Sequence, residues 1–274
     1  MIPVRTVDEV FTAIQKVKAA APAFCTNFFP VQKKLQGWID HGELTSESRN
    51  GAAFFCRRDR DFQHFYFCGA SVATLKAEIG NLSILKSQRV VTDVVGSETA
   101  LGELLSCLET AGFRRYSHLQ RMARTSQPGL ASASGADAPA VFAEAPDKQA
   151  ILELLDNSFN HYADQLPAAY EIEAAIAAKQ ILAIKCDGEL AAILFFETQG
   201  LTSTVRYWVV AERFQSKRLG ASLIRHYFAA QNAVKRFILW VVATNDNAVK
   251  KYQHYGYSAD GLIDHVLANE MIQR

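Results

Sequence analysis

The spacing of hydrophobic residues along this chain changes between the helical and the strand period, and these changes outline its elements. Apolar positions three and four residues apart predict helices over 7–20, 31–38, 72–79 and 97–111. Runs of β-branched and aromatic residues predict strands over 52–56, 62–68, 89–95 and 113–122. We interpret the charged run 57–61, which lies between two of these strands, as the solvated tip of a hairpin. The first half is therefore expected to mix strands and helices.

The second half ends in the same way as the first. Its pattern predicts a strand over 237–243, a helix over 247–254 and a last strand near 264–271. In both halves the helix is followed by a glycine and an aromatic residue, Gly112-Phe113 and Gly256-Tyr257. The repeat predicts two related α/β domains in tandem, although two unrelated α/β units would give the same pattern.

A run of small and polar residues between the halves has no periodic apolar pattern, which is typical of a linker. We place the domains at 1–124 and 140–274, with the linker at 125–139. The length of 274 residues suits two modest domains, each with its own core.

Composition narrows the classes of function. The chain has 29 Lys and Arg against 28 Asp and Glu, so no net field draws it to nucleic acid or to an anionic membrane. We therefore expect neither partner. No apolar stretch approaches a membrane span, and the N-terminus lacks the apolar core of a secretory signal. The five cysteines are widely separated and lack metal-ligand spacing. These features predict a cytoplasmic protein with reduced thiols and no metal site.

One strand-to-helix connection carries candidate chemistry. The strand 205–210 leads through a polar loop into a helix whose start contains Gly220. Backbone N–H groups at such a start can converge on a phosphate or pyrophosphate. A plain tight turn with one glycine is the structural alternative.

Two motifs here resemble the GNAT (GCN5-related N-acetyltransferase) superfamily. Its signature loop is Arg or Gln, two residues, Gly, one residue, then Gly or Ala, and here that loop runs Gln215-Ser216-Lys217-Arg218-Leu219-Gly220. Downstream, the family's N-x-x-A, Tyr and Gly-aromatic pattern is matched by Asn245, Ala248, Tyr252 and Gly256-Tyr257. The resemblance covers roughly 141 to the C-terminus. It implies an α/β fold in which a mainly antiparallel sheet is flanked by helices, here as tandem GNAT-like domains.

The chain departs from the family at Arg218, where glycine is usual. If the backbone there needs a positive φ, the side chain is unfavourable and cofactor binding is weaker. If φ is helical, the guanidinium and Lys217 instead help to bind a phosphate.

The resemblance implies acetyl-CoA as the co-substrate. Its pyrophosphate would lie on the N–H groups of 215–221, and a backbone N–H near Val209 or Val210 would polarise the thioester carbonyl. The implied cofactor-binding residues are Trp208, Val209, Val210, Gln215, Ser216, Lys217, Arg218, Leu219, Gly220, Ala221, Ser222, Asn245, Asn247 and Tyr252.

The implied reaction is direct attack of a primary amine on the thioester, without an acyl-enzyme. Tyr252 matches the family tyrosine that protonates the departing thiolate, with core packing as its structural alternative. An alkylammonium must first lose a proton, and Glu197 is our first candidate for the base. Glu171, His161 and Tyr162 follow as acceptor-side residues, although surface or packing roles suit all four.

The first half has no counterpart of the CoA loop and is expected not to bind CoA. It either braces the second domain as a degenerate copy, or its aromatic segments 24–30 and 62–67 help to form an acceptor pocket. The leading hypothesis is an N-acetyltransferase acting on a small-molecule or peptide amine. The alternatives are a tRNA-dependent aminoacyl transferase and a non-catalytic CoA-binding or interaction module. The sequence does not identify the acceptor amine, and it leaves open whether the protein forms a homodimer.

Overall fold

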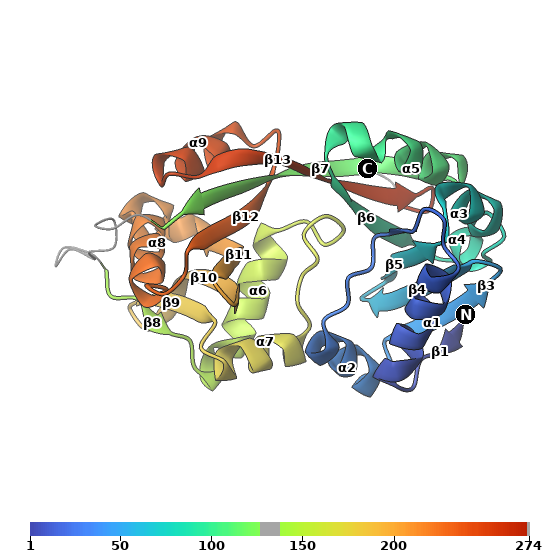
Figure 1. Ribbon diagram of the computed structural model, residues 1–274. Helices are drawn as coiled ribbons and strands as arrows, with labels where there is room; N and C mark the ends of the chain where they lie inside the picture. The colour runs from blue at the N-terminus through green and yellow to red at the C-terminus, as the bar shows by residue number, and fades with distance from the viewer. Residues whose placement is uncertain (127–137, 273–274) are drawn as a thin grey trace. The chain divides into compact units, whose positions relative to one another are not determined.

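The computed structural model describes residues 1–126 and 138–272, and these divide into two compact units. Unit 1 is Met1–Leu119 with Gly261–Arg274, and unit 2 is Gln120–Asp260. Each combines helices with a largely antiparallel sheet, which confirms the predicted fold class (Figure 1). No helix among the described residues is both long and apolar enough to cross a membrane.

Unit 1 is a sheet in the order β1-β3-β4-β5-β6-β13-β7, with β2 beside β5. Its strands are β1 Ile2–Pro3, β2 Cys25–Thr26, β3 Leu44–Arg49, β4 Ala52–Asp59, β5 Phe62–Gly69, β6 Val90–Gly96, β7 Phe113–Thr125 and β13 Ser258–Asn269. Its helices are α1 Val7–Ala19, α2 Gln32–Asp40, α3 Val72–Ile79, α4 Ile84–Ser87 and α5 Glu98–Thr110. One face of β4 and β5 forms a core with α3 and α5.

The sheet of unit 2 has the order β7-β12-β11-β10-β9-β8, in which β7 contributes its later residues. Its further strands are β8 Val141–Phe142, β9 Ile181–Cys186, β10 Glu189–Gln199, β11 Thr202–Val210 and β12 Arg236–Val242. Its helices are η1 Ala145–Asp147, α6 Lys148–Ser158, α7 Ala169–Ala177, η2 Glu212–Lys217, α8 Leu219–Ala230 and α9 Asp246–His254. Separate cores form under α8 on one face of the sheet and under α6 and α7 on the other (Figure 1).

The two units repeat one plan. In each, three antiparallel strands are followed by a parallel pair, β5 with β6 and β11 with β12. A helix, a glycine with positive φ and a long strand follow in both, at Gly112 and Gly256.

The boundaries of the compact units differ from those of the expected domains because the long strands β7 and β13 are each divided between the two units. Strand β13 pairs antiparallel with β6 along Ile263–Ala268. The C-terminal strand therefore completes the sheet of unit 1, whereas the expected boundaries place it with the second domain. Most of the predicted linker, 127–137, lies outside the described residues.

The predicted solvated tip at 57–61 is wrong. The ladder between β4 and β5 continues to Asp59 opposite Phe62, so only Arg60 and Asp61 form the turn. Arg57 and Asp59 are buried, with 6% and 8% of their surfaces exposed. Because side chains alternate between the two faces of a strand, Arg57 and Asp59 both point to the covered face of the sheet.

Candidate active site

In unit 2, β11 and β12 diverge after a short parallel ladder. Their pairing runs from Thr202 with Arg236 to Val205 with Leu239. Beyond Val205, β11 continues to Val210 while pairing with β10 on its other side. The later part of β11 therefore has an edge that β12 does not pair, and we call the segment 206–210 the open edge.

A β-bulge at Arg206 begins the open edge. Phe195 pairs with Tyr207 and Phe196 with Val205, which leaves Arg206 without a residue opposite it on β10. An extra residue reverses the side-chain alternation. Accordingly, Val205 packs in the core under α8, whereas Tyr207 packs in the core under α6 and α7.

The hydrogen bonding of β11 shows which N–H groups face the open edge. The Ala211 N–H donates to the Ala191 carbonyl at 2.9 Å, toward β10. Strand N–H groups alternate in direction, so that of Val209 also faces β10, while those of Trp208 and Val210 face away. Of the two expected oxyanion donors, Val210 therefore has the suitable direction.

The loop after β11 holds Arg218 in the left-handed conformation. Its φ is +56° and its ψ is 21°, so the structure realises the positive-φ alternative. This conformation costs a residue with a side chain about 1–2 kcal/mol. It redirects the chain from η2 into α8, as the family glycine would.

Helix α8 begins directly after this turn. The first N–H groups of a helix have no partner inside it. Here they belong to Leu219 and Gly220, while Ala221 donates to the Arg218 carbonyl at 3.1 Å. A Cβ on Gly220 would meet Trp208 Nε1 at 3.4 Å, an ordinary contact, so the helix start lies against the open edge.

The charged side chains of the loop differ in their partners. Arg213 pairs with Glu189 at 2.5 Å and lies over the ring of Phe214, over which Lys217 also lies. Gln215, Ser216, Lys217 and Arg218 are exposed. Ser222, by contrast, is buried, and its hydroxyl donates to the Ala138 carbonyl at 2.5 Å. The cations are thus available to a phosphate, whereas Ser222 is engaged with the chain.

Helix α9 brings Tyr252 to Trp208. Their ring centroids are 5.6 Å apart. Burial, followed by the charge of Asp164, raises the pKa of the Tyr252 hydroxyl to about 12. Asn245 caps the helix by accepting from the Ala248 N–H at 3.1 Å, and Asn247 is exposed on its first turn. Tyr252 is therefore a protonated hydroxyl beside the open edge.

The expected acceptor-side residues lie in two places. Glu197 is on β10 opposite Thr204, and Glu171 accepts from the Ala168 N–H at 2.9 Å at the start of α7. Burial lowers the pKa of Arg206, but the charges of Tyr207, Glu197 and Glu171 raise it above its ordinary value. Both carboxylates are thus within electrostatic range of Arg206.

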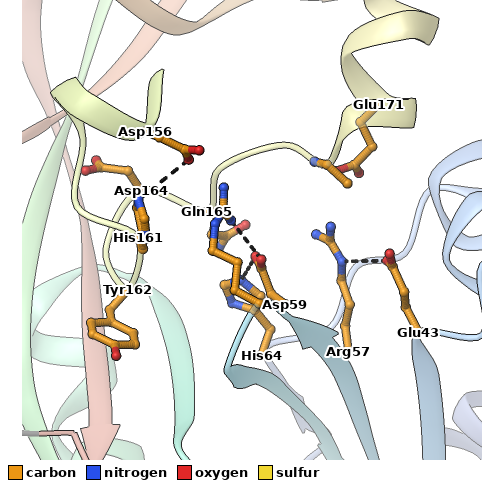
Figure 2. Close-up of polar contacts among 12 residues, drawn as sticks. Glu43, Arg57, Asp59, His64, Asp156, His161, Tyr162, Asp164, Gln165 and Glu171 are labelled. Carbon is orange, nitrogen blue, oxygen red and sulfur yellow. Dashed lines mark hydrogen bonds and ion pairs between the residues drawn. The ribbon is translucent and has the colours of Figure 1, made fainter. Parts of the chain in front are cut away.

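His161 and Tyr162 lie on the loop between α6 and α7 (Figure 2). His161 Nε2 is 3.6 Å from Asp156 Oδ1, and both side chains are substantially exposed. The backbone N–H of Tyr162 donates to Asn160 Oδ1 at 2.9 Å.

Asp164, on the same loop, is a residue that the sequence analysis missed. Its carboxylate is half-buried, and burial raises its pKa above the ordinary value, although the Asn160 N–H lowers it. The only sequence signal is its spacing from Asn160, which lets the two residues close a tight polar turn.

In unit 1, the helix that follows the corresponding strand, α3, starts differently from α8. There the Ser71 hydroxyl accepts from the Thr74 N–H at 3.1 Å and caps α3. Its sheet instead carries a buried ionic cluster, in which His64 Nε2 lies 3.0 Å from Asp59 Oδ2 and Arg57 lies near Glu43 (Figure 2). The described residues contain no group of three potential metal ligands.

Comparisons with known proteins identify a family match and a shared fold. Residues 148–257 match the acetyltransferase (GNAT) family. No curated protein matches the sequence.

Solved structures extend the likeness to the whole chain. A tandem GNAT protein from the clavulanic acid biosynthesis pathway is 12% identical with a TM-score of 0.62, covering 100% of this chain and 98% of its own. A GCN5-related N-acetyltransferase from Sphaerobacter thermophilus is 15% identical with a TM-score of 0.61, over 81% and 77%. One from Kribbella flavida is 16% identical with a TM-score of 0.57, over 86% and 93%. At these identities the likeness shows that the chain shares the fold of these proteins, over its whole length in the case of the tandem GNAT protein.

Proposed function

Residues 148–257 form a domain of the acetyltransferase (GNAT) family, and from this premise we propose that the protein transfers an acetyl group from acetyl-CoA to a primary amine. The observation that carries the proposal is one juxtaposition in unit 2. The start of α8, with its unpaired N–H groups, and the ring of Tyr252 both lie against Trp208, which is on the open edge of β11.

The start of α8 is suited to the pyrophosphate of the donor. The N–H groups of Leu219 and Gly220 and the positive end of the helix dipole favour an anion. Although the backbone of Arg218 takes the positive φ, its side chain is exposed, so Lys217 and Arg218 both add charge that can contact phosphate oxygens.

The open edge is suited to the acyl end of the donor. Val210 would donate its N–H to the thioester oxygen and stabilise the negative charge that develops there on attack. The amine nitrogen forms the new C–N bond as the C–S bond breaks. Tyr252 would give its proton to the departing thiolate.

The proposal is tested by calorimetric titration with acetyl-CoA and with CoA. Wild type and Gly220→Ala should bind, because the added Cβ makes only ordinary contacts. Gly220→Trp should lose binding while its circular dichroism stays that of the folded protein. Absence of binding to wild type would contradict the proposal.

Turnover separates an enzyme from the non-catalytic CoA-binding alternative. Wild type is assayed for release of CoA thiol with a panel of primary amines. Binding without turnover of any amine would favour the binding module.

A further inference from the structure

Asp164 is held in place by two independent sets of hydrogen bonds. Its Oδ2 accepts from the Asn160 N–H at 2.8 Å. Its backbone carbonyl accepts from the Tyr207 hydroxyl at 3.1 Å, and the same hydroxyl donates to the Gln165 carbonyl at 2.7 Å. Since Tyr207 is on the open edge, the strand that would hold the thioester also holds the backbone of the loop that carries this carboxylate.

The surroundings of Asp164 supply hydrogen bonds but no cation. The carboxylate is half-buried, and no Lys, Arg or His among the described residues forms an ion pair with it. Other acids of unit 2 differ: Asp147 pairs with Lys185 at 2.6 Å, and Glu189 pairs with Arg213 at 2.5 Å. Partial burial without a cation disfavours the charged carboxylate, so the position favours a positively charged ligand.

Asp164 also lies within electrostatic range of the proposed acid. Its charge is one of the two causes that raise the pKa of the Tyr252 hydroxyl. The proposed acid is therefore within range of the charge of Asp164, whereas Glu171 is engaged in capping α7.

We infer that the acceptor is a primary alkylamine that enters as its ammonium ion, and that Asp164 binds this ion and accepts its first proton. The inference rests on the proposed function. It assigns the base to a residue other than Glu197 and makes an amine with a positive charge at the nitrogen that reacts the preferred acceptor.

The proton count of this sequence balances. The ammonium gives one proton to Asp164 and becomes a neutral amine, which attacks the carbonyl carbon. Tyr252 protonates the departing thiolate and becomes a phenolate, which then takes the second proton from the amide nitrogen. Asp164 finally releases its proton to solvent, so each turnover yields an amide, a thiol and one proton.

The test compares Asp164→Asn with wild type in turnover of benzylamine, which is charged at neutral pH, and aniline, which is neutral. Asn retains an oxygen for the Asn160 N–H, so the loop is preserved. With benzylamine, kcat/KM should fall roughly 100-fold, whereas the fall with aniline should be under about tenfold. Glu153→Gln, an exposed change on α6 at a carboxylate that bonds Gln149, is the matched control and should change neither value.

Binding of benzylammonium to the CoA-loaded protein separates the role of Asp164 from the proposal of acetyl transfer. If no amine is acetylated, benzylammonium is titrated into wild type and Asp164→Asn with CoA bound. At least tenfold weaker binding to the variant supports the role of Asp164 even if acetyl transfer fails. Equal binding, absence of binding to wild type, or an equal loss of turnover with both amines would overturn it.

Discussion

The Tyr207 hydroxyl donates a hydrogen bond of 2.7 Å to the backbone carbonyl of Gln165, which joins the open edge to the loop that carries Asp164. Gln165 has a φ of +45°, a conformation that a residue with a side chain holds only when its surroundings impose it. Burial raises the pKa of Tyr207 to about 12, so the hydroxyl remains a donor at neutral pH.

Tyr207→Phe removes this connection with little change in volume. We expect a loss of about 1 kcal/mol in the free energy of unfolding, because the carbonyls of Asp164 and Gln165 lose a buried donor. The KM for the amine should rise while the affinity for CoA stays unchanged. Urea unfolding and calorimetry measure these effects, and a loss of CoA affinity would show that Tyr207 supports the donor site instead.

The left-handed turn at Arg218 predicts a difference between two small substitutions. Arg218→Ala and Arg218→Gly both remove the guanidinium, but only glycine accepts a φ of +56° without strain. We expect the free energy of unfolding of the glycine variant to be about 1 kcal/mol higher than that of the alanine variant. Equal stability in urea would mean that the loop relaxes when the arginine is removed.

The same pair of variants measures the contribution of the charge. If Arg218 contacts a phosphate, both variants should bind CoA several-fold more weakly than wild type, and the difference should shrink at high salt. Unchanged affinity would restrict Arg218 to the turn.

Tyr252→Phe should lower kcat roughly 100-fold and leave CoA affinity unchanged, because only the proton donor is lost. The acid form is present below its pKa of about 12 and is lost above it. The wild-type rate should therefore show no alkaline decline from Tyr252 between about pH 7 and pH 10. If the wild-type rate declines between about pH 7 and pH 10 and the Tyr252→Phe rate does not, Tyr252 loses its proton in that range and this assignment is contradicted.

The buried pair of Asp59 and His64 predicts an acid-sensitive component of stability. Burial raises the pKa of Asp59, but the hydrogen bond and charge of His64, with Arg57 and Arg60, lower it overall. A depressed folded-state pKa gives stability that is present above the unfolded value of about 4 and is lost as pH falls through the folded value. Asp59→Asn should cost about 2 kcal/mol at pH 7, and this difference should shrink below about pH 4.

Asp61→Asn is the control for Asp59→Asn, because Asp61 lies in the same turn and pairs with Arg89 at the surface. An exposed ion pair contributes about 0–1 kcal/mol. Unfolding free energies measured between pH 3 and pH 7 should separate the two variants, and equal costs would contradict the role of burial.

Local sequence was sufficient for much of this protein. The periods of the apolar residues predicted α3 and α5 because a helix face or a strand pair is defined by residues close in sequence. The resemblance to the family's motifs singled out the loop 215–220 and Tyr252, and the repeated helix, glycine and strand predicted the tandem fold that the neighbour over the whole chain supports. The roles of the site residues remain predictions.

Only the tertiary structure decided the features that depend on partners distant in the chain. The bulge at Arg206 arises from the pairing of β11 with β10, and the same pairing sets the direction of the Val210 N–H. Asp164 became a candidate through burial and through Tyr207, and Arg57 and Asp59 became buried because their strand continued past the expected turn. A sequence pattern records the period of a side chain, whereas its burial, its charge partners and the strand opposite it are set by packing.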